Sequence, residues 1–315
     1  MQPFKPSISI CILTFNRCSL LRGLLTELTR LEYVPLEIIV IDNHSEDMTQ
    51  TMMKQDFPAV TYIRTEENLG AAGRNIGMES AKGHIIITLD DDVTGLTDSA
   101  LHMLANEFEE DRKLGAINFR VINNDGHTCN WVHHCEEEKF SDKKFLTYEI
   151  TEGAVAFSKE ALHISGYYPK SFFLSHEGPD LAFRIFDQGF KVTYTGDVVV
   201  RHSFAQGSRE PWRNYYYDTR NQFWLAARNF PVSYAIAYLS RGLLSMLVYS
   251  LRDGYSMYWL RAVADGLKGL RQALKERKVL TDTTMETIRI IDSHRPSLVY
   301  LIKSRLIWRK DLLFR

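Results

Sequence analysis

Cysteine is scarce in this chain, which has four among its 315 residues: Cys11, Cys18, Cys129 and Cys135. Four thiols are too few for the disulfide scaffold of a small secreted protein, so we expect all of them to be reduced. The last two lie among three histidines between positions 127 and 134, but their spacing matches none of the usual zinc-binding patterns. We therefore favour a polar loop with buried thiols over a structural zinc site.

Internal repeats, low-complexity tracts and uncharged apolar runs of about 20 residues are also missing. Residues 1–6 lead directly into a strand-like run with no separate hydrophobic stretch of the secretory type, so we expect a cytoplasmic protein. Residues 229–251 are uncharged except for Arg241, which leaves runs of 12 and 10 residues. A spanning helix needs about 20 apolar residues. We therefore predict helices that pack on the body of the protein or lie in a membrane interface.

A net charge of −1 hides two regions of opposite sign. Residues 1–200 hold 18 Lys and Arg against 30 Asp and Glu, whereas residues 201–315 hold 20 against 9. A basic C-terminal third fits an anionic surface, so we predict peripheral membrane contact through residues 229–315, on the cytoplasmic face. Packing on the body or formation of a homo-oligomer is the alternative. No nucleic acid is expected, because no known nucleic-acid-binding module is present.

Part of this basic region has the pattern of an amphipathic helix. Apolar residues step by three and four positions, and basic residues form an adjacent stripe. The apolar stripe consists of Leu260, Val263, Leu267, Leu270 and Leu274, and the basic stripe of Arg261, Lys268, Arg271, Lys275 and Lys278.

Segments with strand and helix patterns alternate through the first 90 residues. Apolar runs near 7–13, 36–42, 60–64 and 84–90 are separated by segments that include helical patterns at 20–31 and 71–81. This alternation predicts an α/β fold with a mostly parallel sheet and flanking helices. We further predict Ser45 as a helix N-cap, a helix at 98–111, strands at 115–121 and 151–157, and a helix from Ser158 to Gly166. The aromatic, basic character from Trp212 onward divides the chain into a body, 1–211, and a helical appendage, 212–315.

Asp90, Asp91 and Asp92 follow the apolar run 85–89. Three adjacent carboxylates repel one another, so they are tolerated in water, around a cation, or with shifted pKa values. In open α/β sheets, ligands bind beyond the carboxyl ends of the strands, where this triad would lie. The triad therefore predicts half of a metal and phosphate site, with a solvated turn as the alternative.

Two further polar motifs follow neighbouring strands. Asp42 and Asn43 begin a turn after the second strand, where a carboxylate can accept hydrogen bonds from a ribose or a base. Residues 68–77 open the next helix with small residues, which let a ligand approach backbone N–H groups, and Arg74 adds a cation for a diphosphate. This segment has neither a dinucleotide fingerprint nor a P-loop. Ordinary turn chemistry and close helix–sheet packing are the alternatives.

In this order, the motifs resemble those of family 2 glycosyltransferases, which are inverting enzymes with the GT-A fold. The resemblance covers about residues 7–208 and also includes Glu-Gly-Ala at 152–154, segment 172–184 and Val-Arg-His at 200–202. It implies a catalytic domain over residues 1–211 that moves a sugar from a nucleoside diphosphate donor to a hydroxyl of a glycan or lipid-linked acceptor. Cell-surface polysaccharide synthesis and a divalent cation, Mn²⁺ or Mg²⁺, are implied as well.

The resemblance also assigns roles to residues. Asp42 would contact the nucleobase, Asp90 the ribose or sugar, and Asp92 the cation, with His202 as a further metal ligand. Hard oxygen ligands suit Mn²⁺ or Mg²⁺, which would neutralise the leaving diphosphate. The other predicted donor contacts are Thr14, Asn16, Arg17, Asn43, Asn68, Gly70, Arg74, Asn75 and Asp91.

The chain departs from the family at the catalytic base. An inverting transfer needs a carboxylate that takes the proton of the acceptor hydroxyl. The family pattern Glu-Asp-x-Asp-Leu-x-x-Arg has this base at its second position, which is Gly178 here. Glu177 and Asp180 remain as catalytic candidates. We favour Glu177, because Pro179 at the first position of a helix would leave it just outside that helix.

Two other functions stay open at this point. A protein that lost its base at Gly178 would bind a nucleotide sugar without transferring it. A sugar-nucleotide pyrophosphorylase is disfavoured, because residues 11–17 are not its glycine-rich loop. His176 and Glu152 are weaker candidates for the base, and we expect Arg184 to brace the carboxylates.

Overall fold

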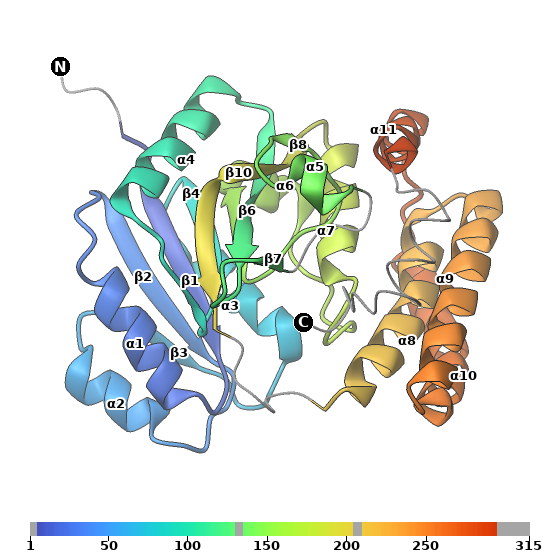
Figure 1. The fold of residues 1–315 in the computed structure, drawn as a ribbon, viewed down its shortest axis with the longest axis horizontal. Coiled ribbons are helices and arrows are strands. Elements are labelled where there is room, and N and C mark those ends of the chain that lie inside the picture. The colour runs from blue at the N-terminus through green and yellow to red at the C-terminus, as the bar shows by residue number, and fades with distance from the viewer. Residues whose placement is uncertain (1–4, 130–134, 204–209, 295–315) are drawn as a thin grey trace.

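A computed structural model of the chain describes residues 5–129, 135–203 and 210–294 (Figure 1). Strands and helices alternate through its first half, as predicted. The elements are β1 (Ile8–Thr14), α1 (Cys18–Leu28), β2 (Leu36–Asp42), α2 (Thr49–Asp56), β3 (Thr61–Arg64), the short 3₁₀ helix η1 (Gly70–Ala72), α3 (Gly73–Ser80) and β4 (Ile85–Asp90).

Within the described residues, the second half of the body holds the two longest strands, several short strands and four helices, and four further helices follow. The body continues with β5 (Val93–Thr94), α4 (Asp98–Glu110), β6 (Leu114–Ile122), β7 (Thr128–Cys129), α5 (Glu137–Phe140), β8 (Phe145–Leu146), β9 (Ala154–Ser158), α6 (Lys159–Ser165), α7 (Glu177–Asp187) and β10 (Lys191–His202). The C-terminal helices are α8 (Trp212–Asn229), α9 (Val232–Arg252), α10 (Ser256–Lys275) and α11 (Asp282–Ser293).

One mixed sheet forms the centre of the body, in the order β3-β2-β1-β4-β9-β6-β10-β5. Strands β3, β2, β1 and β4 are parallel neighbours, whereas β9 runs antiparallel to both β4 and β6. The predicted α/β fold is confirmed, although β9 and the short strands β5, β7 and β8 run antiparallel to their neighbours. The register pairs Thr14 with Asp42 and Leu13 with Asp90, so the carboxyl ends of β1, β2 and β4 meet at one edge.

The sheet buries side chains on both faces, because successive residues of a strand point in opposite directions. Along β1, Ile10 and Ile12 pack with leucines of α1 and α4, while Cys11 packs with residues of α3, α6 and α7 on the other face. Helices α8 and α11 contribute Leu225 and Ile288 to that second cluster. The appendage therefore packs directly on the body, and the division after residue 211 stays a prediction.

Two local predictions are wrong. Helix α2 begins at Thr49 and the Ser45 hydroxyl does not cap it; instead it accepts a hydrogen bond from the Asn16 N–H at 2.9 Å. Helix α7 begins at Glu177, directly after a left-handed His176, so Pro179 is its third residue and not its first.

The helix predicted from Ser158 to Gly166 is confirmed. The Ser158 hydroxyl accepts a hydrogen bond from the Ala161 N–H, and Gly166 ends the helix with a φ of 81°. The zinc alternative cannot be followed here, because two of its histidines, His133 and His134, lie outside the described residues. Cys129 is half-buried and Cys135 is buried, as expected of thiols packed beneath a loop.

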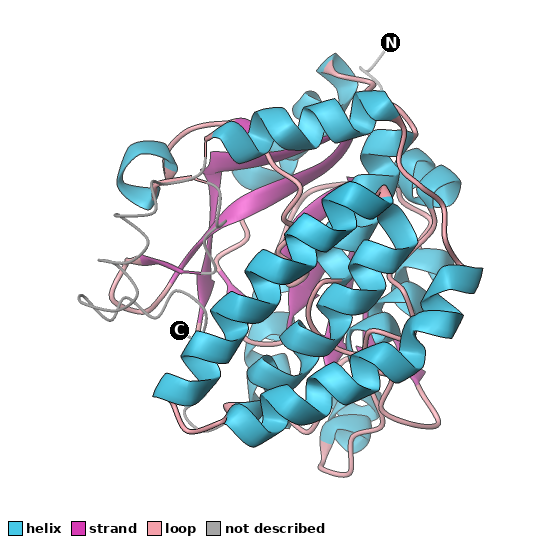
Figure 2. Ribbon diagram, turned by 90° about the vertical axis from the view of Figure 1, so that its right-hand side faces the viewer, coloured by secondary structure: helices cyan, strands magenta, loops and turns pink. Residues whose placement is uncertain are grey.

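Helix α10 is amphipathic as predicted, but three of its leucines face outward, whereas Val263 and Leu270 of the predicted apolar stripe are half-buried. Cβ atoms at Gly266 and Gly269 would meet Phe223 and Trp224 of α8 at 2.5 and 2.4 Å, so glycines permit the close approach of the two helices. The opposite face carries Leu260, Leu267 and Leu274, which are 52–54% exposed and which we call the outward leucine stripe. Figure 2 shows long helices of the appendage lying side by side on this side of the molecule.

Helix α9 also leaves apolar side chains in contact with solvent. Within the described residues it is one helix that is long and apolar enough to cross a membrane, by length and composition alone, and 11% of its apolar window is buried. Its exposed residues include Val232, Ile236, Leu244 and Leu251.

Candidate functional site

The aspartate triad lies at the carboxyl end of β4, and two of its three side chains are buried. Asp91 accepts hydrogen bonds from the Thr14 hydroxyl at 2.8 Å and from Arg17 Nη1 at 2.9 Å. The same Arg17 nitrogen donates to Asp92 Oδ2 at 2.7 Å. Burial raises the pKa of Asp91 to about 6, against the opposing effect of Arg17. The triad is therefore a buried charge cluster rather than a solvated turn.

The side chains of Asp90, Asp92 and His202 lie close enough together to hold a metal ion. Strand β5 pairs with the end of β10, which brings His202 Nε2 to 3.0 Å from Asp92 Oδ1. One ligand atom from each of the three residues lies within 4.8 Å of the others. Two carboxylates and an imidazole are a donor set that Mn²⁺ accepts readily and that also suits Mg²⁺. The residues present thus fit a divalent cation.

Arg74 places a buried positive charge beside this group. It lies in the first turn of α3 and forms an ion pair with Asp90, whose side chain keeps 22% of its surface exposed. Burial works against the charged form of Arg74, but Asp90 and other nearby acids raise the pKa of its guanidinium above the ordinary value. Arg74 therefore stays charged at the edge of the sheet where the strand ends meet.

Asp42 is fully buried at the end of β2. Its carboxylate accepts hydrogen bonds from the Ser45 N–H at 2.7 Å and from the Tyr62 hydroxyl. Burial, followed by the hydrogen bond to Asp42, raises the pKa of Tyr62 above its usual value. The sequence interpretation missed Tyr62, although its place in the strand next to β2 was a usable signal.

Asn43, Asn68 and Gly70 are brought together as the motifs suggested. The Asn43 amide donates to Asn68 Oδ1 at 2.9 Å and to the Gly70 carbonyl at 3.1 Å. Gly70 has a φ of 62°, and a Cβ there would lie 2.2 Å from the Phe173 carbonyl oxygen. That carbonyl also accepts a hydrogen bond from the Ala71 N–H at 2.7 Å. The small residues of this motif thus allow contact with the loop that precedes α7.

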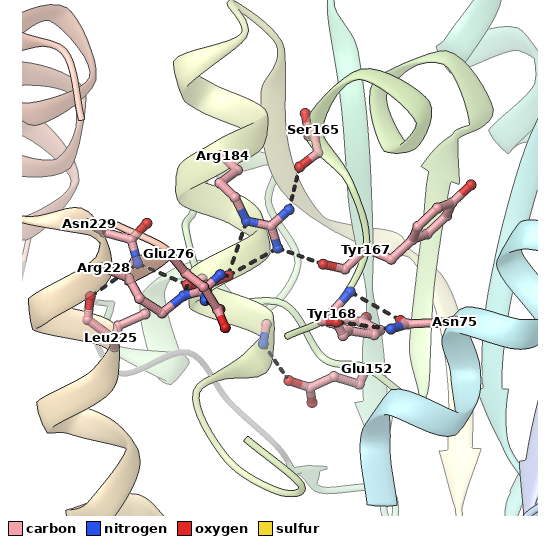
Figure 3. A network of polar contacts seen from close by, with 12 residues as sticks. Asn75, Glu152, Ser165, Tyr167, Tyr168, Arg184, Leu225, Arg228, Asn229 and Glu276 are labelled. Atoms are coloured by element: carbon pink, nitrogen blue, oxygen red, sulfur yellow. Dashed lines mark hydrogen bonds and ion pairs between the residues drawn. The ribbon is translucent and has the colours of Figure 1, made fainter. Parts of the chain in front are cut away.

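Asn75 and Asn16, two residues predicted to contact the sugar donor, form side-chain hydrogen bonds within the protein. The Asn75 amide donates to the Tyr168 carbonyl at 2.8 Å and accepts from the Tyr168 N–H at 3.1 Å (Figure 3). Asn16 accepts a hydrogen bond from the Glu46 N–H at 2.7 Å. Both side chains hold loops around the site, and contact with a donor stays a prediction for each.

Asp180, in the first turn of α7, is buried in a network of cationic and amide groups from the last turns of α7 and α8. Arg184 Nε and Arg228 Nε donate to its two oxygens at 3.0 and 2.9 Å, and Asn229 Nδ2 donates at 2.9 Å. Burial alone would raise its pKa, but the two arginines and Asn229 hold that pKa below the ordinary value. Figure 3 shows Arg184 and Arg228 converging from α7 and α8. The expected bracing role of Arg184 is confirmed.

The other acidic candidates lie around the start of α7. Glu177, its first residue, is buried with 3% of its surface exposed. Glu152 is only partly buried, and its Oε1 accepts a hydrogen bond from the Gly178 N–H at 3.1 Å (Figure 3). Burial raises the pKa of Glu152, although Arg74 opposes this effect. His176 Nε2 lies 2.9 Å from Asp218 Oδ1 of α8.

The loop before α7 has an unusual backbone that α8 holds in place. Phe173, Ser175 and His176 all have positive φ values, between 65° and 69°. Asn221 of α8 donates to the carbonyls of residues 172, 174 and 175 at 3.0, 2.6 and 2.7 Å. Backbone strain of this kind persists where the surroundings enforce it, and it is concentrated at functional sites. The sequence interpretation missed Asn221, because nothing in its local pattern indicates a partner about 50 residues away.

Comparison with known proteins agrees with this geometry. The mannosyltransferase PcManGT of Pyrobaculum calidifontis, solved with GDP-Man and Mn²⁺, superposes with a TM-score of 0.56 at 19% identity, over 98% of this chain and 89% of that one. S. aureus TarS, solved with UDP-GlcNAc, gives a TM-score of 0.60 at 14% identity, over 91% and 90% of the two chains. At these identities the likeness establishes the fold, which is GT-A.

Sequence comparison identifies the family. The GalNAc(5)-diNAcBac-PP-undecaprenol beta-1,3-glucosyltransferase of Campylobacter jejuni is 33% identical over 109 residues, which are 32% of this chain and 35% of that protein. This chain therefore spans about a third of the length of that relative. The model of the family described as Glycosyl transferase family 2 matches residues 9–164. Through these residues, this chain belongs to glycosyltransferase family 2.

Proposed function

We propose that this glycosyltransferase is a metal-dependent, inverting enzyme that moves a sugar from a nucleoside diphosphate to a hydroxyl group. The observation that carries the proposal is the cluster of Asp90, Asp92 and His202, with Arg74 and Arg17 beside it. Acidic and imidazole ligands flanked by two arginines match a diphosphate bound through a cation.

In this proposal, each group of residues at the carboxyl edge of the sheet has a role. Asp90, Asp92 and His202 would hold Mn²⁺ or Mg²⁺, which supplies positive charge to the departing nucleoside diphosphate. Arg74 binds the diphosphate or the sugar next to Asp90. Asp42 and Tyr62 receive the nucleobase at the end of β2, and the Asn68–Gly70 turn closes the donor site against the loop before α7.

We also propose that the acceptor is a glycan precursor, carried on a lipid, in cell-surface polysaccharide synthesis. The Campylobacter relative is named for a lipid-linked acceptor, PP-undecaprenol. The outward leucine stripe and the exposed apolar residues of α9 offer a surface for peripheral contact with a membrane. Exposed basic residues next to the stripe favour anionic lipids at the cytoplasmic face.

The test is release of nucleoside diphosphate by the purified full chain. UDP-, GDP- and dTDP-sugars are offered with Mn²⁺ or Mg²⁺, with CMP-sugars as the control that lacks a diphosphate. We expect release from at least one diphosphate sugar that stops when EDTA removes the cation. Saturable donor binding without any release, with water and with glycan acceptors, would favour the non-catalytic sugar-nucleotide-binding protein.

A further inference from the structure

The space beside Gly178 is filled by the carboxylate of Glu152, which lies in the turn before β9. A Cβ built on Gly178 would lie 2.5 Å from Glu152 Oε1 and 2.7 Å from the Ile150 carbonyl oxygen. Contacts below 3.0 Å do not occur for real Cβ atoms, so no larger residue fits here unless its surroundings move. An oxygen of Glu152 thus lies where a side chain at position 178 would begin.

We propose that Glu152 is the catalytic base of this enzyme and replaces the carboxylate that the family pattern has at position 178. The proposal rests on the glycosyltransferase function proposed above. In it, Gly178 is required because its missing side chain leaves the space that the Glu152 carboxylate occupies.

The backbone next to Glu152 ties the proposed base to the donor site. A Cβ on the adjacent Gly153 would lie 2.4 Å from Asp90 Cγ, so the Asp90 carboxyl packs directly over that glycine. The Asp90 N–H donates to the Gly153 carbonyl at 3.2 Å, and the Thr88 hydroxyl donates to the Glu152 carbonyl at 2.6 Å. The base therefore stands one residue away from the contact with Asp90, at the edge of the proposed donor and cation site.

The competing acids are less suited to receive a proton from an acceptor. Asp180 is fully buried and bound by two arginines and Asn229, which stabilise its ionised form. Glu177 has 3% of its surface exposed, whereas Glu152 is only partly buried. A base must come within hydrogen-bond reach of the hydroxyl that it deprotonates. Of these three acids, Glu152 is the one that is not fully buried, which favours it for contact with an acceptor.

The start of α7 also prepares Glu152 for this role. The Gly178 N–H, the second of that helix, donates to its Oε1, which leaves the other carboxylate oxygen to accept a proton. The charged and titratable groups around it are Arg74 of α3, Asp90 of β4, Tyr168 and Glu177. In the proposed step, the acceptor O–H proton moves to Glu152 as the acceptor oxygen bonds to the anomeric carbon. The bond from that carbon to the phosphate oxygen breaks, and its electron pair leaves with the nucleoside diphosphate.

Glu152→Gln is the test, because an amide oxygen can still accept the Gly178 N–H hydrogen bond. We expect loss of nucleoside diphosphate release by about 100-fold or more, as for removal of a general base, with donor affinity within about threefold of wild type. The acidic limb of the pH profile of kcat/KM should disappear. Glu149→Gln, three residues away on the same segment, is the matched control and should keep wild-type release.

A conservative variant separates catalysis from capping of the helix. Glu152→Asp keeps a carboxylate that is one methylene shorter, and we expect it to release more nucleoside diphosphate than Glu152→Gln and to keep the acidic limb of the pH profile. Wild-type release in Glu152→Gln overturns the inference and leaves the proposed function intact. If Glu152→Gln loses donor binding and nucleoside diphosphate release to the same extent, Glu152 has a structural role and is not the base. If Glu177→Gln loses release and Glu152→Gln does not, Glu177 is the base. A wild-type protein that releases nucleoside diphosphate from no donor overturns both proposals.

Discussion

Replacing Asp180 by asparagine should destabilise the protein strongly. The substitution removes one negative charge that two arginines share at 3.0 and 2.9 Å, and the side chain of Asp180 has no exposed surface. Breaking a buried ion pair by removing one partner costs about 3–5 kcal/mol. Arg228 also pairs with Glu276, and Arg184 donates to the Tyr167 carbonyl at 2.7 Å, so both cations keep a second partner. We therefore expect a loss near about 3 kcal/mol, the lower end of that range.

Urea denaturation at neutral pH measures this loss, with Asp56→Asn as the control. Asp56 pairs with Arg22 at the surface, where both side chains are more than one-third exposed, and such pairs contribute about 0–1 kcal/mol. The pKa of Asp180 is lower in the folded protein than its ordinary value of 3.8. The ionised carboxylate therefore stabilises the fold at pH values above 3.8, and this stabilisation is lost as the pH falls below 3.8 towards the lower folded pKa. The difference between wild type and variant should therefore shrink below about pH 4. A loss no larger than that of Asp56→Asn at neutral pH would refute the account of this network.

The remaining predictions concern the donor turn and the appendage. In urea denaturation, Gly70→Ala should lower the free energy of unfolding by about 1–3 kcal/mol more than Gly126→Ala does. Both glycines have positive φ, but only a Cβ at position 70 would clash, with Phe173, so Gly70→Ala should also weaken nucleotide binding. Equal losses of stability in the two variants would contradict this. Changing all three leucines of the outward leucine stripe to glutamate should reduce co-sedimentation with anionic liposomes by about tenfold or more, since each buried leucine contributes about 1.5–3 kcal/mol. Ile164→Glu, an exposed apolar position on the body, is the control, and unchanged sedimentation of the triple variant would exclude the stripe as a membrane surface.

Local patterns were sufficient for the elements that position the triad. Apolar runs, helical spacing and turn residues act over a few positions, so the strands up to β4 and the helices between them follow from the sequence. Ser45 failed as a cap because its hydroxyl accepts a hydrogen bond from the Asn16 N–H, 29 positions away, a contact that the local pattern does not encode. Its own N–H donates to Asp42. Strand β9 runs against its neighbours, a direction that the strand pattern of 151–157 does not encode.

The site itself was only partly predictable. Motif order brought the triad, Asp42 and His202 into one hypothesis, since the carboxyl ends of parallel strands share an edge. The juxtaposition of Glu152 with Gly178 depends on how the loop after β8 meets the start of α7. Gly178 itself is visible in the sequence, but the sequence does not reveal which side chain lies beside it. The outward direction of the leucine stripe was not predictable either, because it depends on the glycines of α10 that determine which face of this helix packs against α8.

The central claim is that the carboxyl edge of this sheet binds a nucleoside diphosphate through a cation. Titration calorimetry of UDP and GDP into the full chain, with Mn²⁺ and then with EDTA, tests it most directly. The account predicts saturable binding of one nucleotide that requires Mn²⁺ and weakens by at least about tenfold in Asp92→Asn, as for loss of a metal-site interaction. Binding of equal affinity in EDTA, or no binding of either nucleotide, would contradict it.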